Sequence, residues 1–344
     1  MRKLFWSAAG IVLTLAIAVA ALTGTRSGQD FLLERLVAAV LVPAPAETFD
    51  GLRVFICGSS SPLPAANRAQ ACIAILAGED IYLVDAGAGS PLTVNLARLP
   101  LQNLRAVLLT HLHSDHIAAI GDFNMLSWVA GRPVPLEIIG PTGVAQVVAG
   151  FNEAYELDGG YRTAHHGADL LPPNLHAIHA RTIEAGKVLE HNGLEVRAFN
   201  VDHRPIAPAL GFRFDYKGRS VVISGDTVTT PDLLEAAQGA DLLLHDAISI
   251  PIIQAFEKGA KAAGAERQAK ILHDIQDYHA PVAALGQLAQ TAGVKQLALY
   301  HLIPPPQNFF MERMFRRDLP AGAILTEDAM VFDLPANSSD VIVR

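Results

Sequence analysis

The sequence predicts an α/β protein in which two mixed β-sheets pack face to face between outer helices, an αββα sandwich. Three observations predict it: short apolar segments of strand length come first, a helix-like segment follows them, and a second series of strands and a helix closes the chain. The 344 residues suffice for one large α/β domain or two modest ones. A composition of 51% hydrophobic and 17% charged residues fits a packed core and excludes a disordered or fibrous chain.

The predicted elements follow in chain order. The first half is expected to hold a helix at 30–42 and strands at 53–57, 71–76, 81–84, 106–109 and 135–139, followed by a helix at 143–155. Residues 156–173 break this pattern with paired glycines and paired prolines, and we expect them to form a lid over the active site. The second half predicts strands at 194–200, 210–214, 220–223, 242–244 and 296–300, with a helix at 280–292.

The N-terminus carries an export signal. Arg2 and Lys3 precede an apolar run from Leu4 to Leu22, which indicates either a secretory signal or a retained anchor. Ala18-Val19-Ala20 offers a cleavage site, but the run also has nearly the roughly 20 residues that span a bilayer, so both alternatives stay open. In either case the body is expected to be exported, either free in the periplasm or anchored in the inner membrane and facing the periplasm.

These observations divide the chain into three parts. We expect a signal peptide or N-terminal membrane anchor at 1–25, a linker with a short helix at 26–50 and one domain at 51–344. The two cysteines, Cys57 and Cys72, lie in the first predicted strands of that domain. In an oxidising compartment they form a disulfide or remain two separate buried thiols, and the sequence leaves both open.

The segment His111-Leu112-His113-Ser114-Asp115-His116 places four metal-binding side chains within six positions after an apolar strand. On a strand or tight loop, His111 and His113 point the same way, so both can hold one cation. Asp115 and His116 turn into the next helix and face a neighbouring site. Imidazole and carboxylate ligands without thiolate suit Zn²⁺, with Mn²⁺ and Fe²⁺ as alternatives.

This segment matches the central metal motif of the metallo-β-lactamase superfamily. From Arg53 to Pro305 the chain resembles in particular its ribonuclease Z and bacterial arylsulfatase-like branch. The other segments that carry the resemblance, in the family's order, are Asp85-Ala-Gly-Ala-Gly, Val201-Asp-His203, Ser224-Gly-Asp226-Thr227 and Tyr300-His301.

The resemblance implies the metallo-β-lactamase fold and a site for two zinc ions. It implies His111, His113 and His203 at one ion, and Asp115, His116 and His301 at the other. Asp226 would lie between the two ions, and Asp85 would support the metal loop from behind.

The resemblance also implies a mechanism, in which a hydroxide shared by the two ions attacks an ester. Asp115 would orient this hydroxide or accept its proton, while Asp246 would orient His279 to protonate the departing oxygen. The family usually has a glutamate where Asp246 stands and a serine or threonine where Ala280 stands, so the sequence departs from the pattern at both positions.

The expected substrate is a small-molecule sulfate ester, with an aryl sulfate leading. Ribonuclease Z normally carries a long tRNA-gripping arm between its third motif and its Ser-Gly-Asp-Thr segment, whereas here only a short hairpin, 211–223, separates His203 from Asp226. Export and the net charge of −8 also favour no nucleic-acid partner. The alternatives are a phosphodiesterase (cyclic nucleotide or ribonuclease Z-like), a lactonase and, weakest, a non-catalytic metal-bound binding protein. A homodimer stays open.

Overall fold

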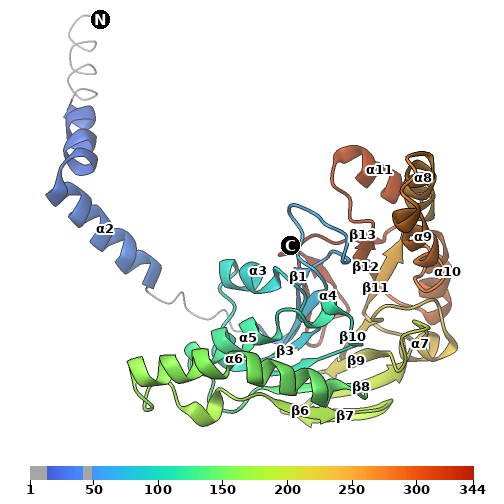
Figure 1. The fold of residues 1–344 in the computed structure, drawn as a ribbon, viewed down its shortest axis with the longest axis horizontal. Helices are drawn as coiled ribbons and strands as arrows, with labels where there is room; N and C mark the ends of the chain where they lie inside the picture. Colours follow the sequence, from blue (N-terminus) through green and yellow to red (C-terminus); the bar gives the residue numbers. More distant parts are fainter. Residues whose placement is uncertain (1–13, 42–48) are drawn as a thin grey trace, which may run out of the picture. The chain divides into compact units, whose positions relative to one another are not determined.

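The computed structural model describes residues 14–41 and 49–344 (Figure 1). The chain divides into two units, Met1–Thr48 and Phe49–Arg344. Arg2, Lys3 and the first part of the predicted signal or anchor lie outside the described residues. In the N-terminal unit, residues 14–24 are helical and α2 spans Arg26–Leu41. Among the described residues, the search for a helix with the length and apolar character of a membrane span finds none.

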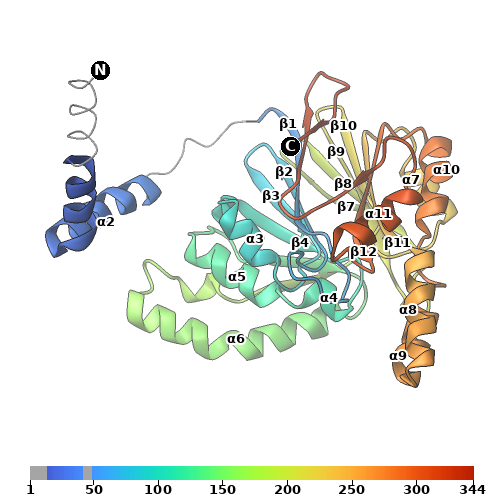
Figure 2. The ribbon, with the colours of Figure 1, turned by 90° about the horizontal axis from the view of Figure 1, so that it is seen from above.

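The second unit contains two mixed sheets (Figure 2). The first sheet has the strand order β15-β14-β1-β2-β3-β4-β5-β6, with β1 (Gly51–Gly58), β2 (Cys72–Ala77), β3 (Asp80–Val84), β4 (Leu104–Leu108), β5 (Glu137–Gly140), β6 (His179–Thr182), β14 (Val331–Pro335) and β15 (Ile342–Val343). The second has the order β13-β12-β11-β10-β9-β8-β7, with β7 (Gly186–His191), β8 (Leu194–Asn200), β9 (Leu210–Tyr216), β10 (Arg219–Ile223), β11 (Leu242–Ile248), β12 (Gln296–Ile303) and β13 (Ile324–Leu325).

Each sheet changes from antiparallel to parallel pairing partway across. In the first sheet β3, β4, β5 and β6 run parallel, and in the second β10, β11, β12 and β13 do. The parallel strands are covered on both faces, which explains why β11 begins with the unbroken apolar run Leu242–Leu244 instead of an alternating pattern.

Helices cover the outer face of each sheet. Their bounds are α3 (Ser90–Leu96), η1 (Leu101–Asn103), α4 (Ser114–Ile117), α5 (Ile120–Val129), α6 (Val144–His166), η2 (Pro173–Leu175), α7 (Pro231–Ala236), α8 (Ile250–Ala262), α9 (Glu266–Asp274), α10 (Val282–Ala292) and α11 (Phe309–Arg317). Phe123 of α5 and Val144 of α6 pack on the first sheet, while Leu285 of α10 and Phe315 of α11 pack on the second.

A third core lies between the sheets. Ile75 of the first sheet and Phe212 of the second are fully buried in it, in one cluster that joins the inner faces of both. Three apolar layers separated by two sheets make an αββα sandwich, and the predicted fold class is confirmed.

The predicted lid at 156–173 is wrong for its first half, because α6 continues without a break to His166. Gly159 is tolerated inside this helix because the ring of His176 lies against it, and a Cβ atom there would come within 2.4 Å of that ring. The helix ends at Gly167, whose φ of 91° suits glycine. Paired glycines therefore mark a close contact here and not a helix boundary.

Two chain connections in the second unit bear on predictions made from the sequence. Cys57 and Cys72 form a disulfide at the ends of β1 and β2, which closes the loop between them. Between His203 and Asp226, β9 and β10 form a short antiparallel hairpin, with Tyr216 opposite Arg219. The predicted hairpin is therefore present.

Candidate metal centre

The seven predicted metal ligands lie on segments that continue from strands of both sheets. His111 and His113 follow β4, with Asp115 and His116 on the short helix α4 directly after them. The remaining three follow or lie on strands of the second sheet: His203 after β8, Asp226 after β10 and His301 near the end of β12. Six of the seven are buried and His113 is half-buried, so the two sheets meet in a polar cluster at one end of the sandwich.

Asp85 holds the histidine loop from behind. Its φ of 61° turns the chain directly after β3, and its carboxylate accepts hydrogen bonds from the backbone N and the Oγ1 of Thr110, both at 2.9 Å. The same carboxylate lies 2.8 Å from Nδ1 of His116, which leaves Nε2 of that ring to face the cluster. This is the supporting role that the resemblance implied for Asp85.

His301 reaches the cluster through a β-bulge. Asp246 pairs with Tyr300 and Ala247 pairs with Leu302, so His301 is an extra residue in the ladder between β11 and β12. Its φ of 44° lies in the left-handed region, which a non-glycine residue adopts only where the surroundings hold it. The bulge turns the imidazole out of the regular alternation of the strand.

Asp226 lies at the centre of the cluster. Its Oδ2 atom is 3.2 Å from Nε2 of His301 and 3.4 Å from Nε2 of His116. The Nε2 atoms of His111 and His203 lie 3.9 Å away on the other side. One carboxylate oxygen thus faces four imidazole nitrogens, which is the arrangement expected of a residue between two cations.

The structure groups the donors as predicted. Groups of side chains whose donor atoms lie within 4.8 Å of one another include His111-His113-His203 and Asp115-His116-His301, while Asp226 joins further groups with His111 and His116 and with His203 and His279. The geometry therefore brings all seven predicted residues together. Their role as metal ligands stays a prediction.

The electrostatics of the cluster favour ionised carboxylates. Burial alone would raise the pKa of Asp226, but the nearby imidazoles of His301 and His116 hold that pKa well below its usual range. Burial likewise opposes ionisation of Asp115, and its contacts with His116 and His301 lower the pKa. Both carboxylates are thus anionic and available as ligands at neutral pH.

The residues present fit a pair of metal ions. The second carboxylate oxygen of Asp226, Oδ1, is buried and accepts no hydrogen bond from any described residue, which is costly for an ionised group without a cation. Imidazole nitrogens and carboxylate oxygens from seven side chains, with no thiolate in the cluster of described residues, suit zinc. The unpaired Oδ1 of Asp226 and this set of donors therefore support the prediction that the cluster binds metal.

Asp246 and His279 form a pair beside the cluster. Asp246 lies in β11 and is fully buried, and its Oδ2 is 2.8 Å from Nδ1 of His279. This contact leaves Nε2 of His279 as the ring atom available to the pocket that His279 lines. His245 lies on the other side, with Nδ1 3.0 Å from Oδ1 of Asp246. The aspartate thus holds the pair together despite being one methylene shorter than the family's usual glutamate.

The cluster opens into a cavity of about 120 Å³. His113, Asp115, Asp226, His279 and His301 line one side, and the apolar residues of the other side were not singled out from the sequence. Tyr278 also lines it, and its position next to His279 in the chain was the signal that could have identified it. The apolar lining residues look like ordinary core positions in the sequence, so nothing there marks them.

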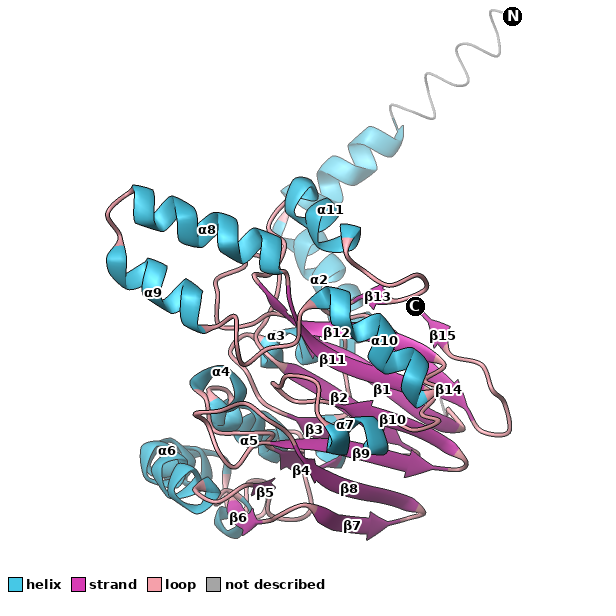
Figure 3. Ribbon diagram, turned by 90° about the vertical axis from the view of Figure 1, so that its right-hand side faces the viewer, coloured by secondary structure: helices cyan, strands magenta, loops and turns pink. Residues whose placement is uncertain are grey.

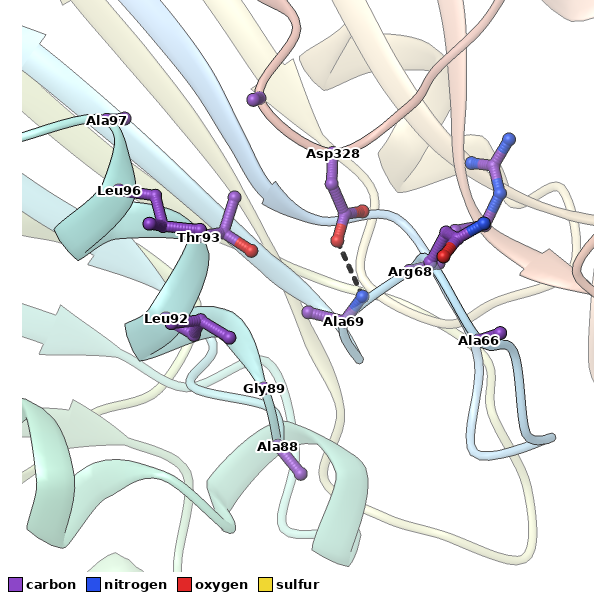
Figure 4. Close-up of a pocket in the computed structure, with 12 residues that line it drawn as sticks. Ala66, Arg68, Ala69, Ala88, Gly89, Leu92, Thr93, Leu96, Ala97 and Asp328 are labelled. Carbon is purple, nitrogen blue, oxygen red and sulfur yellow. Dashed lines mark hydrogen bonds between the residues drawn. The ribbon is translucent and has the colours of Figure 1, made fainter. Parts of the chain in front are cut away.

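A larger hollow of about 670 Å³ lies elsewhere, between α3 and the loop before β2 (Figure 4). Of the described residues that line it, none belongs to the metal cluster. Its polar side chains already bind the protein itself: Asp328 accepts a hydrogen bond from the backbone N of Ala69, and Arg68 donates to Oγ of Ser59 and to the carbonyl of Thr326. The smaller cavity is therefore the candidate reaction site.

Comparisons with known proteins agree with the family resemblance of the sequence. Residues 81–302 match the family model of the β-lactamase superfamily domain. A ribonuclease Z of Mycobacterium marinum is 40% identical over 256 residues, which cover 74% of this chain and 87% of that protein. Among solved structures, human tRNase Z, short form, has a TM-score of 0.58 at 21% identity, with coverage of 82% and 99%. A metallo-β-lactamase-fold protein of Bacillus subtilis has a TM-score of 0.57 at 19% identity, with the same coverage.

These relatives overturn the predicted substrate. The expectation of a sulfate ester, and with it of no nucleic-acid partner, is wrong, because the sequence similarity spans most of the length of a protein named as a ribonuclease. Three inferences misled: the missing arm was taken to exclude ribonuclease chemistry, and the predicted export and the net charge of −8 were taken to exclude RNA. The total charge says little about one cleft, and the metal ligands alone do not distinguish phosphorus from sulfur.

Proposed function

Since the chain belongs to the β-lactamase superfamily, in its ribonuclease Z branch, we propose that it is a zinc-dependent phosphodiester hydrolase that acts on RNA. The observation that carries the proposal is the 40% identity over 87% of a ribonuclease Z, combined with the complete donor cluster around Asp226. The reaction hydrolyses a phosphodiester. A P–O bond forms to the oxygen of water, the P–O bond to the departing oxygen breaks, and the products are a phosphomonoester and an alcohol.

The residues of the cluster divide into two predicted metal sites. His111, His113 and His203 would hold one zinc ion, and Asp115, His116 and His301 the other, with Asp226 between them. Two ions held this way would supply a water of lowered pKa and neutralise charge on the phosphoryl oxygens.

Three residues act in the proton transfers of the proposed mechanism, and one of them, Asp115, is also a predicted metal ligand. Asp115 faces the cavity with an ionised carboxylate, so it can accept a hydrogen bond from the attacking water and orient it. Asp246 fixes the ring of His279 at Nδ1, so that Nε2 donates a proton to the departing oxygen. Proton acceptor and proton donor thus stand at different positions around one reacting phosphorus.

We also propose that the enzyme works outside the cytoplasm. The apolar N-terminal run supports export, and the disulfide between Cys57 and Cys72 fits an oxidising compartment. Intact-mass analysis of the protein recovered from its host, in reduced and unreduced form, tests both points. A full-length mass with free thiols would contradict the proposal, while loss of the first 20 or so residues would indicate a cleaved signal.

The activity test uses the full chain loaded with zinc. We expect cleavage of a short single-stranded RNA and of bis-nitrophenyl phosphate, and no cleavage of nitrophenyl sulfate at the same enzyme concentration. Asp226→Asn, prepared in parallel, controls for contaminating nuclease and should be inactive. A zinc-loaded protein that leaves both phosphodiesters intact would overturn the proposed function.

A further inference from the structure

The residues that line the reaction cavity are of two chemical kinds. The charged and imidazole side chains are described above. The others are apolar and come from three segments, the loop before β2, α9 with the residues that follow it, and the end of β12. We call these residues the apolar wall, and its members are Pro62, Leu63, Ile271, Leu272, Ile275 and Ile303.

The apolar wall is a fixed part of the body. Leu63, Leu272 and Ile275 pack against a small buried core made of Ile248, Ile253 and Ile303. Helices α8 and α9 lie against each other as a hairpin beside this end of the sandwich (Figure 3). The hairpin therefore brings the end of α9 to the cavity and holds it there.

Two members of the wall, Pro62 and Ile271, are exposed. Ile271 is 53% exposed and leaves apolar surface in water beside a charged cluster. Because these exposed side chains line the same cavity as the rest of the wall, they offer apolar surface that a ligand in the cavity would cover.

Tyr278 joins the apolar wall to the metal cluster. Its ring is half-buried and stands edge-on to His203, with centroids 4.9 Å apart, and 4.8 Å from the ring of His279. Its backbone carbonyl lies 3.2 Å from Nδ1 of His203. An aromatic face is thus held at the point where the wall meets the residue that donates the proton.

We propose that the apolar wall and Tyr278 bind the base of the nucleotide that carries the departing oxygen. The proposal rests on the proposed function, because a phosphodiester that reaches the cluster must place its flanking nucleosides at the cavity walls. Base faces are apolar and stack on aromatic side chains whatever the base, so this contact favours RNA without requiring a sequence. Tyr278 lies beside His279, with ring centroids 4.8 Å apart, which assigns the base to the side of the leaving group.

The size of the cavity limits what enters. Cavities that enclose a drug-sized molecule measure about 300–1,000 Å³, several times the volume here. One base therefore occupies the wall while the rest of the RNA runs outside. The enzyme would therefore select its cleavage site through this one base. Such selection suits cleavage beside a flexible, unpaired nucleotide.

The test compares substrates that differ by one base. We would measure kcat and KM for the dinucleotide ApA and for two counterparts, each lacking one of the two bases. The variants are Ile271→Ser, Tyr278→Ala and Tyr278→Phe. Leu157→Ser on α6, where the leucine is 67% exposed, is the matched control for loss of a surface apolar residue. Calorimetric binding of AMP against ribose 5-phosphate gives a readout that does not depend on turnover.

In wild type, removal of the base from the leaving nucleoside should raise KM by about tenfold or more. Ile271→Ser and Tyr278→Ala should raise KM for ApA to a similar extent. Any change in kcat should be the same for ApA and for the counterpart without that base, whose KM should rise by a much smaller factor. Tyr278→Phe should keep the wild-type preference, and AMP should bind more tightly than ribose 5-phosphate only when the wall is intact.

Two outcomes would contradict different claims. Equal KM values for all three substrates in wild type, or equal losses with and without the base in the variants, would overturn the apolar wall as a base site. Complete lack of turnover of all three dinucleotides and of longer RNA would instead overturn the proposed function.

Discussion

Oδ2 of Asp226 lies 3.2 Å from Nε2 of His301, although the two residues belong to different strands and the histidine stands in a β-bulge. The aspartate faces three further imidazoles, and no other carboxylate among the described residues lies near so many of them. Removal of this one charge should therefore affect both predicted metal sites at once.

Asp226→Asn should lose bound zinc and phosphodiester hydrolysis together. The amide keeps the size of the side chain but removes the negative charge that two cations would share, so we expect activity to fall by at least about 100-fold. Metal content by mass spectrometry and turnover of bis-nitrophenyl phosphate measure the two losses. Asp169→Asn, on an exposed loop, is the matched control. Full zinc content in Asp226→Asn would refute the central position of this residue.

Asp246→Asn and His279→Gln should lower kcat and leave zinc bound. Each breaks the contact that orients the proton donor, and loss of general acid catalysis typically costs about 100- to 10,000-fold. His273→Gln, at an exposed histidine on α9, is the control. Since His279 also lies within ligand distance of His203 and Asp226, loss of zinc in His279→Gln would show that it is a ligand and not the proton donor.

Asp85→Asn should weaken zinc binding without abolishing it. Asp85 fixes the ring of His116 through Nδ1, and replacement of such a supporting carboxylate usually lowers metal affinity by about 10- to 100-fold. Titration of the metal-free protein with zinc in the presence of a competing chelator measures the change. An unchanged affinity would mean that His116 needs no such support.

Cys57→Ser combined with Cys72→Ser should destabilise the fold. The disulfide closes a loop with a sequence separation of 15, and loss of a link of that length costs about 3 kcal/mol of unfolding free energy. Urea unfolding of the double variant and of the reduced wild type should agree. Identical stability of the reduced and unreduced wild type would contradict this prediction.

Asp241 should contribute stability that depends on pH. Burial would raise its pKa, but hydrogen bonds from Arg219 and Lys295 lower it below the ordinary value. Because the folded-state pKa is lowered, the contribution is complete above about pH 4 and is lost as the pH falls through the folded-state pKa. Asp241→Asn should cost about 3 kcal/mol or more at pH 7, since it leaves the guanidinium of Arg219 buried without its carboxylate.

Urea unfolding between pH 7 and pH 3 measures this effect. The difference between wild type and Asp241→Asn should narrow toward pH 3, and Glu184→Gln, on an exposed loop, should follow wild type throughout. A difference that stays constant with pH would show that Asp241 acts through packing and not through its charge.

The fold could be predicted because it depends on local patterns, and the family resemblance implied which donors would gather. Strands such as β4 and β10 are short runs with apolar ends, and predicted ligands follow each of them within three residues. The continuation of α6 past Gly159 was not predictable, because it depends on His176 arriving from a later loop. The bulge at His301 was equally hidden, since it is defined only by the pairing of β12 with β11.

The substrate could not be predicted for a different reason. The metal ligands determine which group attacks and how much charge the metal site carries. Discrimination among ester substrates depends instead on the protein surfaces that contact the rest of the substrate. Here those surfaces include Leu63 and Ile275, which come together only in the folded chain and resemble core residues in sequence.

Because His301 stands in a β-bulge, this predicted ligand is not needed for the pairing of β12 with its neighbours. Leu297 and Leu299 face the outer helices and Ala298 and Tyr300 face the opposite sheet, and after the bulge Leu302 again faces the outer helices. A strand that lacked residue 301 would keep this alternation and the same partners in β11. The architecture of this sheet therefore does not require His301, and deletion of this one residue would remove a predicted metal ligand while leaving the pairing of β11 with β12 in place.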